Sequence, residues 1–157
     1  LLSQFFSPLT NKRTDLYGGE VLNRIRLHLE VIKKVREVVG EEYPVFIRLG
    51  ASDYAEGGVT LEDSLIAAKE FEKAGVDVLD ISGGLNGYKV ENESEEGYFW
   101  PLTEAIKKNT NIPVILTGGV VSSKGAEELL ANGKADLIGV GRAILKDSLW
   151  AKEAMEV

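Results

Sequence analysis

The sequence predicts an α/β fold with a parallel sheet, because short apolar runs alternate regularly with amphipathic helical segments. Four runs are rich in Val, Ile and Leu, and they lie at Val45–Leu49, Val76–Ile81, Pro113–Leu116 and Ala135–Val140. Polar residues do not alternate with the apolar ones, which is typical of parallel strands covered on both faces. A helical segment separates each run from the next, so right-handed crossovers within one sheet are expected.

The helical segments have recognisable starts and ends. The first is expected over about residues 20–39, where apolar residues recur at helical spacing, with Gly40 as its C-cap. The second begins near Thr60, which forms with Asp63 a pattern resembling a capping box, and it stops at Gly75. Three more helices are expected, at about Phe99–Lys108, Ser123–Ala131 and Trp150–Met155.

Segments 72–79 and 130–137 share one plan, in which a helix end is followed by glycine, aspartate and an apolar strand. This repeat is that of a βα unit. A chain of 157 residues forms one domain, and its four strands are too few for a closed barrel, which normally needs eight strands and roughly 250 residues. The pattern alone leaves open a doubly wound sheet and half of a barrel.

Composition excludes several classes of function. The net charge of −7 opposes nonspecific binding to nucleic acid and to anionic membranes, and no run of about 18 apolar residues is present to span a bilayer. The absence of Cys removes disulfides, thiolate catalysis and Cys-ligated metals, and it fits a cytoplasmic protein. Because the chain opens on Leu1-Leu2 without Met or a signal-peptide pattern, we expect a fragment or a processed product.

Two strand ends are suited to binding phosphate, since α/β proteins keep their sites at the carboxyl ends of strands. Residues 117–120, Thr-Gly-Gly-Val, join a strand to a helix, where glycines let the backbone approach an anion and the helix offers free N–H groups. Residues 139–142, Gly-Val-Gly-Arg, repeat the arrangement one unit later. Tight turns alone are the alternative, but two adjacent signals favour a phosphate site formed by Gly118, Gly119, Gly141 and Arg142.

Arg48 lies one residue from the end of a predicted buried strand. An arginine there is costly unless it meets a carboxylate or an anionic ligand. Both interpretations stay open at this point, the carboxylate being that of Asp53 or Asp80. The fingerprint G-x-G-x-x-G does not follow any of the predicted strands, so a dinucleotide fold has little support.

Residues 4–19, QFFSPLTNKRTDLYGG, followed by Asn23-Arg24, resemble the long signature of the Old Yellow Enzyme family of NADH:flavin oxidoreductases. The resemblance covers essentially the whole chain, because it continues through residues 46–49, 52–54, 118–119 and 135–142. It implies a TIM (β/α)8 barrel that holds FMN noncovalently at its C-terminal mouth. Residues 1–157 would then be the C-terminal half of that barrel, with strands five to eight.

The resemblance also implies roles for single residues. Arg48 would lie against the pyrimidine side of the flavin, where a cation stabilises the negative charge of the reduced form. Gly118, Gly119, Gly141 and Arg142 would form the loops that bind the FMN phosphate. A structural role in shaping the mouth is expected for the polar residues of the signature, which are Asn11, Arg13, Asp15, Tyr17, Asn23 and Arg24.

In the family pattern, NAD(P)H reduces FMN by hydride transfer, and the flavin passes hydride to an activated alkene or another small-molecule acceptor. The family's substrate-binding His-x-x-His or His-x-x-Asn pair and its proton-donating tyrosine would lie before Leu1. No catalytic residue is therefore assigned with certainty within this chain, which alone is expected to be inactive. The only histidine, His28, falls in the first helix and is expected at the surface.

Two other functions remain as alternatives. Another phosphate-binding barrel enzyme, an aldolase or isomerase, would need a catalytic lysine or acid–base pair at the strand ends, and none of the four predicted strands ends in lysine. A non-catalytic half-barrel would bind ligands or self-associate through its exposed edges, so a homo-oligomer is expected.

The remaining conspicuous side chains are predicted to be structural. The acidic residues Glu91, Glu93, Glu95 and Glu96 suggest a solvated loop that overhangs the flavin rather than a metal site, since no histidine is near and calcium-loop spacing is absent. Trp100 and Trp150 are expected to pack rather than to stack on a nucleotide.

Overall fold

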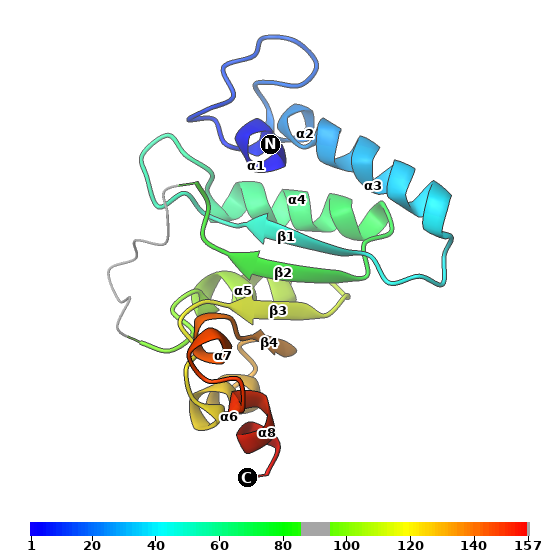
Figure 1. Ribbon diagram of the computed structural model, residues 1–157. Helices are drawn as coiled ribbons and strands as arrows, with labels where there is room; N and C mark the ends of the chain where they lie inside the picture. Colours follow the sequence, from blue (N-terminus) through cyan, green and yellow to red (C-terminus); the bar gives the residue numbers. More distant parts are fainter. Residues whose placement is uncertain (86–94, 157) are drawn as a thin grey trace.

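The computed structural model describes residues 1–85 and 95–156, and it contains a parallel sheet in the order β1-β2-β3-β4 (Figure 1). The strands are β1 Phe46–Gly50, β2 Val78–Ser82, β3 Val114–Thr117 and β4 Leu137–Gly139. The helices are α1 Leu2–Phe6, α2 Val21–Arg24, α3 Arg26–Val39, α4 Leu61–Lys73, α5 Trp100–Lys107, α6 Ser123–Ala131, α7 Arg142–Lys146 and α8 Trp150–Met155. The predicted parallel α/β sheet is confirmed, and each strand lies within two residues of its expected bounds.

The capping box at the start of α4 is present as predicted. The Thr60 hydroxyl oxygen accepts a hydrogen bond from the Asp63 amide at 3.2 Å, and the Asp63 carboxylate accepts one from the Thr60 amide at 3.5 Å. Helices α6 and α8 have the expected bounds, and α5 is one residue shorter at each end. The sequence pattern did not predict α1 or α7, because each has only five residues and is too short to display a helical period.

The single helix predicted over residues 20–39 is instead two, α2 and α3, which meet at Ile25. The Arg24 side chain turns inward to pair with Asp63 at 2.8 Å, and Ile25 is fully buried. Arg24 and Ile25 are thus both buried where the two helices meet. Helix α3 ends at Val39, and Gly40 is its C-cap as expected.

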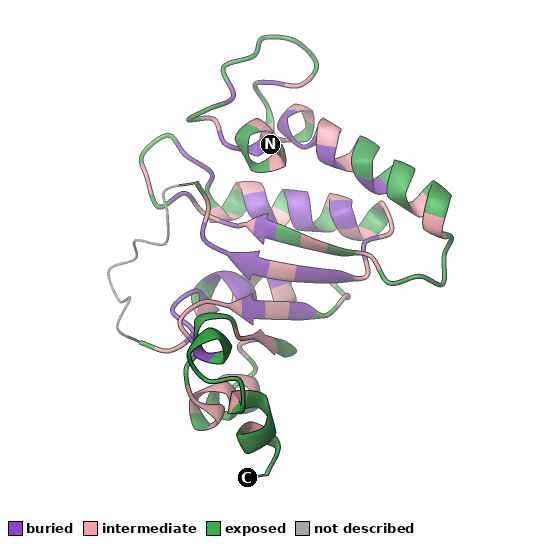
Figure 2. Cartoon of the chain, viewed as in Figure 1, coloured by how far each residue is buried: buried purple, intermediate pink, exposed green. Residues whose placement is uncertain are grey.

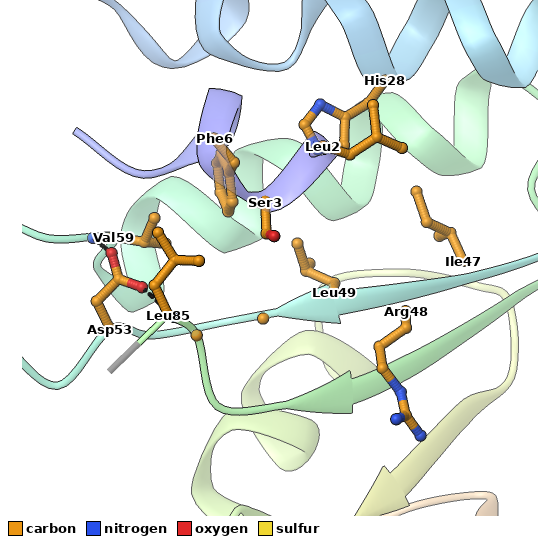
Figure 3. A pocket seen from close by; sticks show the side chains of 12 residues that line it. Leu2, Ser3, Phe6, His28, Ile47, Arg48, Leu49, Asp53, Val59 and Leu85 are labelled. Carbon is orange, nitrogen blue, oxygen red and sulfur yellow. Dashed lines mark hydrogen bonds between the residues drawn. The ribbon is translucent and has the colours of Figure 1, made fainter. Parts of the chain in front are cut away.

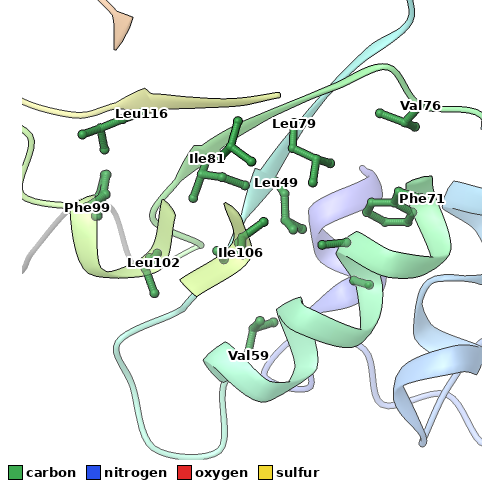
Figure 4. Packing of buried hydrophobic residues seen from close by; sticks show 14 of the residues in the cluster. Leu49, Val59, Phe71, Val76, Leu79, Ile81, Phe99, Leu102, Ile106 and Leu116 are labelled. Atoms are coloured by element: carbon green, nitrogen blue, oxygen red, sulfur yellow. The ribbon is translucent and has the colours of Figure 1, made fainter. Parts of the chain in front are cut away.

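The hydrophobic core lies between one face of the sheet and the helices. Leu49, Leu79, Ile81 and Leu116 point from the strands toward this side and meet Phe71 of α4 and Ile106 of α5 (Figure 4). The other face is less covered within the described residues, since Phe46 is 56% exposed and Leu137 is 48% exposed. Figure 2 shows exposed segments on both β1 and β4. The expectation that all four strands are covered on both faces is therefore wrong for β1 and β4, the two edge strands.

The repeat seen in the sequence corresponds to a repeated contact at the amino ends of the strands. Asp77 precedes β2, accepts a hydrogen bond from the Val45 amide at 2.7 Å and pairs with Arg36 at 2.6 Å. Asp136 precedes β4, accepts one from the Val114 amide at 2.9 Å and pairs with Lys107 at 2.7 Å.

In both units, the aspartate connects the neighbouring strand to the helix before that strand. Asp77 connects β1 to Arg36 in the last turn of α3, and Asp136 connects β3 to Lys107 in the last turn of α5. Val45 and Asp77 are joined by two hydrogen bonds. The Val45 amide donates to the Asp77 carboxylate, and the Asp77 amide donates to the Val45 carbonyl at 2.9 Å. These aspartates hold the amino end of the sheet, which leaves the carboxyl end free to carry a site.

Candidate phosphate and flavin site

The two loops predicted to bind phosphate follow neighbouring strands. Thr117 of β3 is in register with Gly139 of β4, so the Gly118-Gly119 and Gly141-Arg142 loops leave the same edge of the sheet side by side. Tyr98 connects them, because its hydroxyl accepts a hydrogen bond from Arg142 Nη2 at 3.2 Å while its ring lies against Gly119. The fold thus brings the predicted phosphate-site residues together.

These loops have unused hydrogen-bonding groups. Within residues 1–85 and 95–156, the amides of Gly118 and Gly119 have no hydrogen-bond acceptor, and the Arg142 guanidinium has no carboxylate partner. A side chain added at Gly141 would meet no atom within 4 Å, so this loop borders open space. Donors and a fixed positive charge beside open space suit an anion such as a phosphate monoester.

Packing also requires the glycines of the first loop. A Cβ atom at Gly118 would lie 2.6 Å from the Phe99 ring, and one at Gly119 would lie 2.4 Å from the Tyr98 ring. Gly119 also has φ of +68°, in the left-handed region that side chains disfavour. These glycines would therefore be needed for a tight turn even without a ligand. The features that favour an anion site over a simple turn are the Gly118 and Gly119 amides without acceptors and the Arg142 guanidinium.

The amino end of α6 is partly occupied by a carboxylate, although the sequence suggested that its N–H groups would serve phosphate. The Glu96 carboxylate accepts hydrogen bonds from the amides of Val121 at 2.9 Å and Ser122 at 3.0 Å, and from the Ser122 hydroxyl at 2.7 Å. Burial disfavours the charged carboxylate, but the donors of Ser122 and Val121 outweigh it and lower the pKa of Glu96. Glu96 therefore competes with an anion for this part of the edge, whereas the amides of Gly118 and Gly119 and the Arg142 guanidinium have no carboxylate partner within the described residues.

The prediction of a solvated acidic loop is accordingly wrong for Glu96, which caps a helix. Glu95 is exposed as expected, whereas Glu91 and Glu93 lie outside the described residues. The predicted packing role of Trp100 is confirmed, since its side chain packs against the core and carries the Lys134 ammonium 3.7 Å from its ring centroid. The Trp150 indole N–H donates a hydrogen bond to the Val121 carbonyl at 2.7 Å, which connects α8 to the loop between β3 and α6.

Arg48 points away from Ile47 and Leu49, toward the less covered face of the sheet (Figure 3). Its guanidinium pairs with Asp80, the residue in register on β2, at 2.7 Å. Of the two carboxylates that the sequence offered, Asp80 is therefore the partner. The pair is accessible, because the Arg48 side chain is 58% exposed.

Asp53, the other carboxylate, has a separate structural role that the sequence did not reveal. It is buried and accepts a hydrogen bond from the Ser7 hydroxyl at 2.6 Å. It also accepts hydrogen bonds from the amides of Val59 and Leu85 at 2.8 Å each (Figure 3). These partners come from the segment after α1, the segment before α4 and the segment after β2. Asp53 thereby fixes three loops at the carboxyl end of the sheet.

Residues 4–19, which carry the family signature, are held together largely by hydrogen bonds among themselves. The Asn11 side chain donates to the carbonyls of Phe5 and Tyr17 at 2.6 and 2.7 Å, and it accepts from the Arg13 amide at 3.1 Å. Arg13 pairs with exposed Asp15, and this hydrogen-bonded ion pair lowers the pKa of that carboxyl. Contacts within the segment support the expected structural role of these residues.

His28 is buried, with 4% of its surface exposed, so the prediction of a surface residue is wrong. The residue faces inward because α1, which was not predicted, packs on α3 and brings Phe6 against the imidazole at 6.1 Å between ring centroids. His28 also lines a cavity of about 60 Å³ between α1 and β1 (Figure 3).

A wider groove of about 530 Å³ lies between α3 and α4, and its lining combines Lys33, Arg36 and Lys73 with Glu37, Glu41 and Glu70. This mixture of charges favours no single class of ionic ligand. Among the described residues, no three acidic or histidine side chains are placed to hold a metal ion. Within that same part of the chain, every helix is too short or too polar to cross a membrane.

The chain is similar in sequence to enzymes named as NADH oxidases and NADPH dehydrogenases. It is 42% identical to an NADH oxidase of Thermoanaerobacter brockii over 99% of its length and 25% of that protein. It is 43% identical to an NADPH dehydrogenase of Halalkalibacterium halodurans over 98% of its length and 45% of that protein. The chain thus spans less than half the length of either relative.

Solved structures give the same relationship. A 2-naphthoyl-CoA reductase in complex with 2-naphthoyl-CoA matches 99% of this chain and 24% of its own, with a TM-score of 0.91 and 31% identity. An old yellow enzyme homologue from Zymomonas mobilis matches 99% of this chain and 43% of its own, with a TM-score of 0.74 and 26% identity.

The family model of the NADH:flavin oxidoreductase / NADH oxidase family matches residues 1–156. Enzymes of this family use FMN with NAD(P)H as the reductant. The strand-end loops, the paired arginine and the matching sequence therefore lead to one conclusion, that the chain belongs to the NADH:flavin oxidoreductase / NADH oxidase family.

Proposed function

We propose that this chain is the FMN-phosphate-binding part of an NAD(P)H:flavin oxidoreductase, and that residues 1–157 correspond to strands five to eight of a (β/α)8 barrel. The carrying observation is the convergence of the Gly118-Gly119 and Gly141-Arg142 loops, with Arg142 free of a carboxylate partner within the described residues. The chain spans less than half of its first relatives, so the catalytic activity is proposed for the longer protein.

The residues of this chain would bind and orient the cofactor, whereas FMN supplies the capacity to accept and donate hydride. The amides of Gly118 and Gly119 would donate to the phosphate, and Arg142 would provide a charge-assisted hydrogen bond. Arg48 would lie beside the pyrimidine ring, where a positive charge stabilises the reduced flavin. Each of these groups lies toward the carboxyl ends of the strands.

The proposed reaction transfers hydride from NAD(P)H to FMN and then to an activated alkene or another acceptor. Relatives named NADH oxidase and NADPH dehydrogenase support the use of both pyridine nucleotides within the family. Neighbours named 2-naphthoyl-CoA reductase and morphinone reductase support an organic acceptor. Oxidation of NADH or NADPH by the longer protein, with and without an enone, would measure the reaction.

Arg142→Ala tests the phosphate site. Loss of a charge-assisted hydrogen bond should weaken FMN binding by about 1–3 kcal/mol, while riboflavin, which lacks the phosphate, should bind as before. Lys146→Ala is a matched control, because Lys146 is an exposed cation on the same helix. Titration of flavin fluorescence would give both affinities. Unchanged FMN affinity in the Arg142 variant would contradict the proposed site.

A further inference from the structure

Three polar side chains form a row across the less covered face of the sheet. Arg48 on β1 is in register with Asp80 on β2, and Asp80 is in turn in register with Ile115 of β3, two residues before Thr117. Side chains two residues apart on a strand share a face, so Thr117 faces the same side as Arg48 and Asp80. The row lies on the side opposite the hydrophobic core.

Both oxygen atoms of the Asp80 carboxylate are engaged. Oδ2 accepts hydrogen bonds from Arg48 Nε at 2.8 Å and makes the 2.7 Å ion pair with Nη2, while Oδ1 accepts from the Thr117 hydroxyl at 2.6 Å. The next strand leaves room for this hydroxyl, because a Cβ atom at Gly139 would lie 2.0 Å from Thr117 Oγ1. Asp80 therefore holds one orientation and fixes the direction of the guanidinium.

Within the described residues, the ion pair leaves much of the Arg48 side chain accessible. The Arg48 side chain is 58% exposed, whereas the Asp80 side chain is 19% exposed and lies between Arg48 and Thr117. In the Arg24–Asp63 pair, which joins two helices, the aspartate is similarly exposed at 20%, but the arginine is only 6% exposed. A fixed but accessible arginine is suited to act on something that binds above the sheet.

We propose that Asp80 is a positioning residue for the flavin, because it fixes Arg48 and offsets part of its positive charge, and so sets the reduction potential of bound FMN. The proposal rests on the proposed function, in which Arg48 lies beside the flavin. Arg48 stabilises the negative charge of reduced FMN and raises the potential, and the Asp80 carboxylate opposes that effect. Thr117 disperses the carboxylate charge through its hydrogen bond and anchors the pair.

The two-electron potential of bound FMN, measured against a reference dye in the longer FMN-binding protein, distinguishes these effects. Asp80→Asn removes the opposing negative charge and should raise the potential, whereas Arg48→Gln should lower it. Thr117→Val keeps both charges but removes a donor from the carboxylate, and should lower the potential as well. Glu127→Gln makes the same change of net charge as Asp80→Asn at an exposed position on α6 and should leave the potential unchanged.

The outcomes separate this proposal from the proposed function. If FMN binds and Arg48→Gln lowers the potential but Asp80→Asn does not raise it, the role of Asp80 is refuted and the flavin site stands. If neither Arg48→Gln nor Asp80→Asn changes the potential of bound FMN, Arg48 is not beside the flavin and both proposals fail. If Asp80→Asn does not fold, Thr117→Val carries the test, and an unchanged potential in that variant overturns the role of Asp80.

Discussion

His28 is the only histidine of the chain, and its burial couples its ionisation to folding. The imidazole stacks on Phe71 with 5.6 Å between ring centroids and meets Phe6 edge-on. Within the described residues, its Nδ1 atom is buried without a hydrogen-bond partner. Burial disfavours the imidazolium and lowers the pKa of His28 from 6.5 to about 4.

Stability should therefore fall in mildly acidic solution. Because the folded state disfavours the protonated form, the stabilisation is complete above the unfolded pKa of 6.5 and is lost as the pH falls toward about 4. The loss should reach about 3 kcal/mol over this range, at about 1.4 kcal/mol per pH unit. Urea unfolding of the protein at a series of pH values from 7.5 to about 4 would measure it.

His28→Phe is the matched variant, since it keeps an aromatic ring between Phe6 and Phe71 and removes the ionisable group. Most of the stability loss between pH 6.5 and pH 5 should then disappear. A variant that retains the full pH dependence of the wild-type protein would show that carboxyl groups, and not His28, cause it.

Single residues were predictable where a local pattern defines their chemistry, and not where a distant contact does. Arg48 and Arg142 could be selected because each lies at the end of an apolar strand, and the sequence even offered Asp80 as a partner for Arg48. The roles of Asp53, Glu96 and Tyr98 depend on contacts with distant residues, such as the Ser7–Asp53 contact across 46 residues and the Tyr98–Arg142 contact across 44. Side-chain spacing contains no signal for contacts of that kind.

At the level of secondary-structure elements, the two aspartates before β2 and β4 make equivalent contacts. Hydrogen bonds from Val45 and Arg36 lower the pKa of Asp77. Burial opposes ionisation of Asp136, but the contacts with Lys107 and the Val114 amide lower its pKa overall. Each carboxylate therefore stabilises the fold in its charged form, and this stabilisation should persist above pH 3.8 and be lost as the pH falls through the depressed pKa.

Asp77→Asn and Asp136→Asn should each reduce the free energy of unfolding by about 0.5–1 kcal/mol, since each weakens a hydrogen bond from a strand amide and removes an ion pair that water screens, the two aspartates being 45% and 36% exposed. The two sites lie on strands separated by β3, roughly 10 Å apart, so their effects should add in the double variant. Denaturant unfolding would measure all three, with Glu127→Gln as the control for charge. No change in either single variant would show that these contacts serve no stabilising purpose.

Elements were predictable in proportion to their length and to the strength of their end signals. Thr60 and Asp63 fixed the start of α4 because a capping box is a local interaction between residues three apart. The break at Ile25 was not predictable, because an inward turn of Arg24 is stabilised by Asp63 on a different helix. The same limit applies to α1, whose position depends on packing against α2 and α3.

At the level of the whole molecule, the described residues form a sheet with two edge strands and one face that the helices cover less than the other. Within the described residues, β1 and β4 each pair on one side only. Phe46 and Leu137 are exposed on these edge strands. Leu137 lies on the same face as Arg48, because the strand pairing places Arg48, Asp80, Ile115 and Leu137 next to one another across the sheet. Unpaired edges with exposed apolar side chains favour association with another sheet.

We therefore predict that this chain, expressed alone, forms a dimer or larger assembly, because two copies joined edge to edge would form eight strands related by two-fold symmetry. Light scattering coupled to size exclusion would give its mass in solution. Phe46→Lys and Leu137→Lys place a charge on the less covered face at each edge strand and should shift the chain toward the monomer. Val38→Lys, at a residue that is 85% exposed on α3, adds the same charge away from the sheet and should leave the assembly intact. A wild-type chain that remains monomeric at high concentration would contradict edge pairing, and equal dissociation by all three lysine variants would attribute the association to net charge instead of to this face.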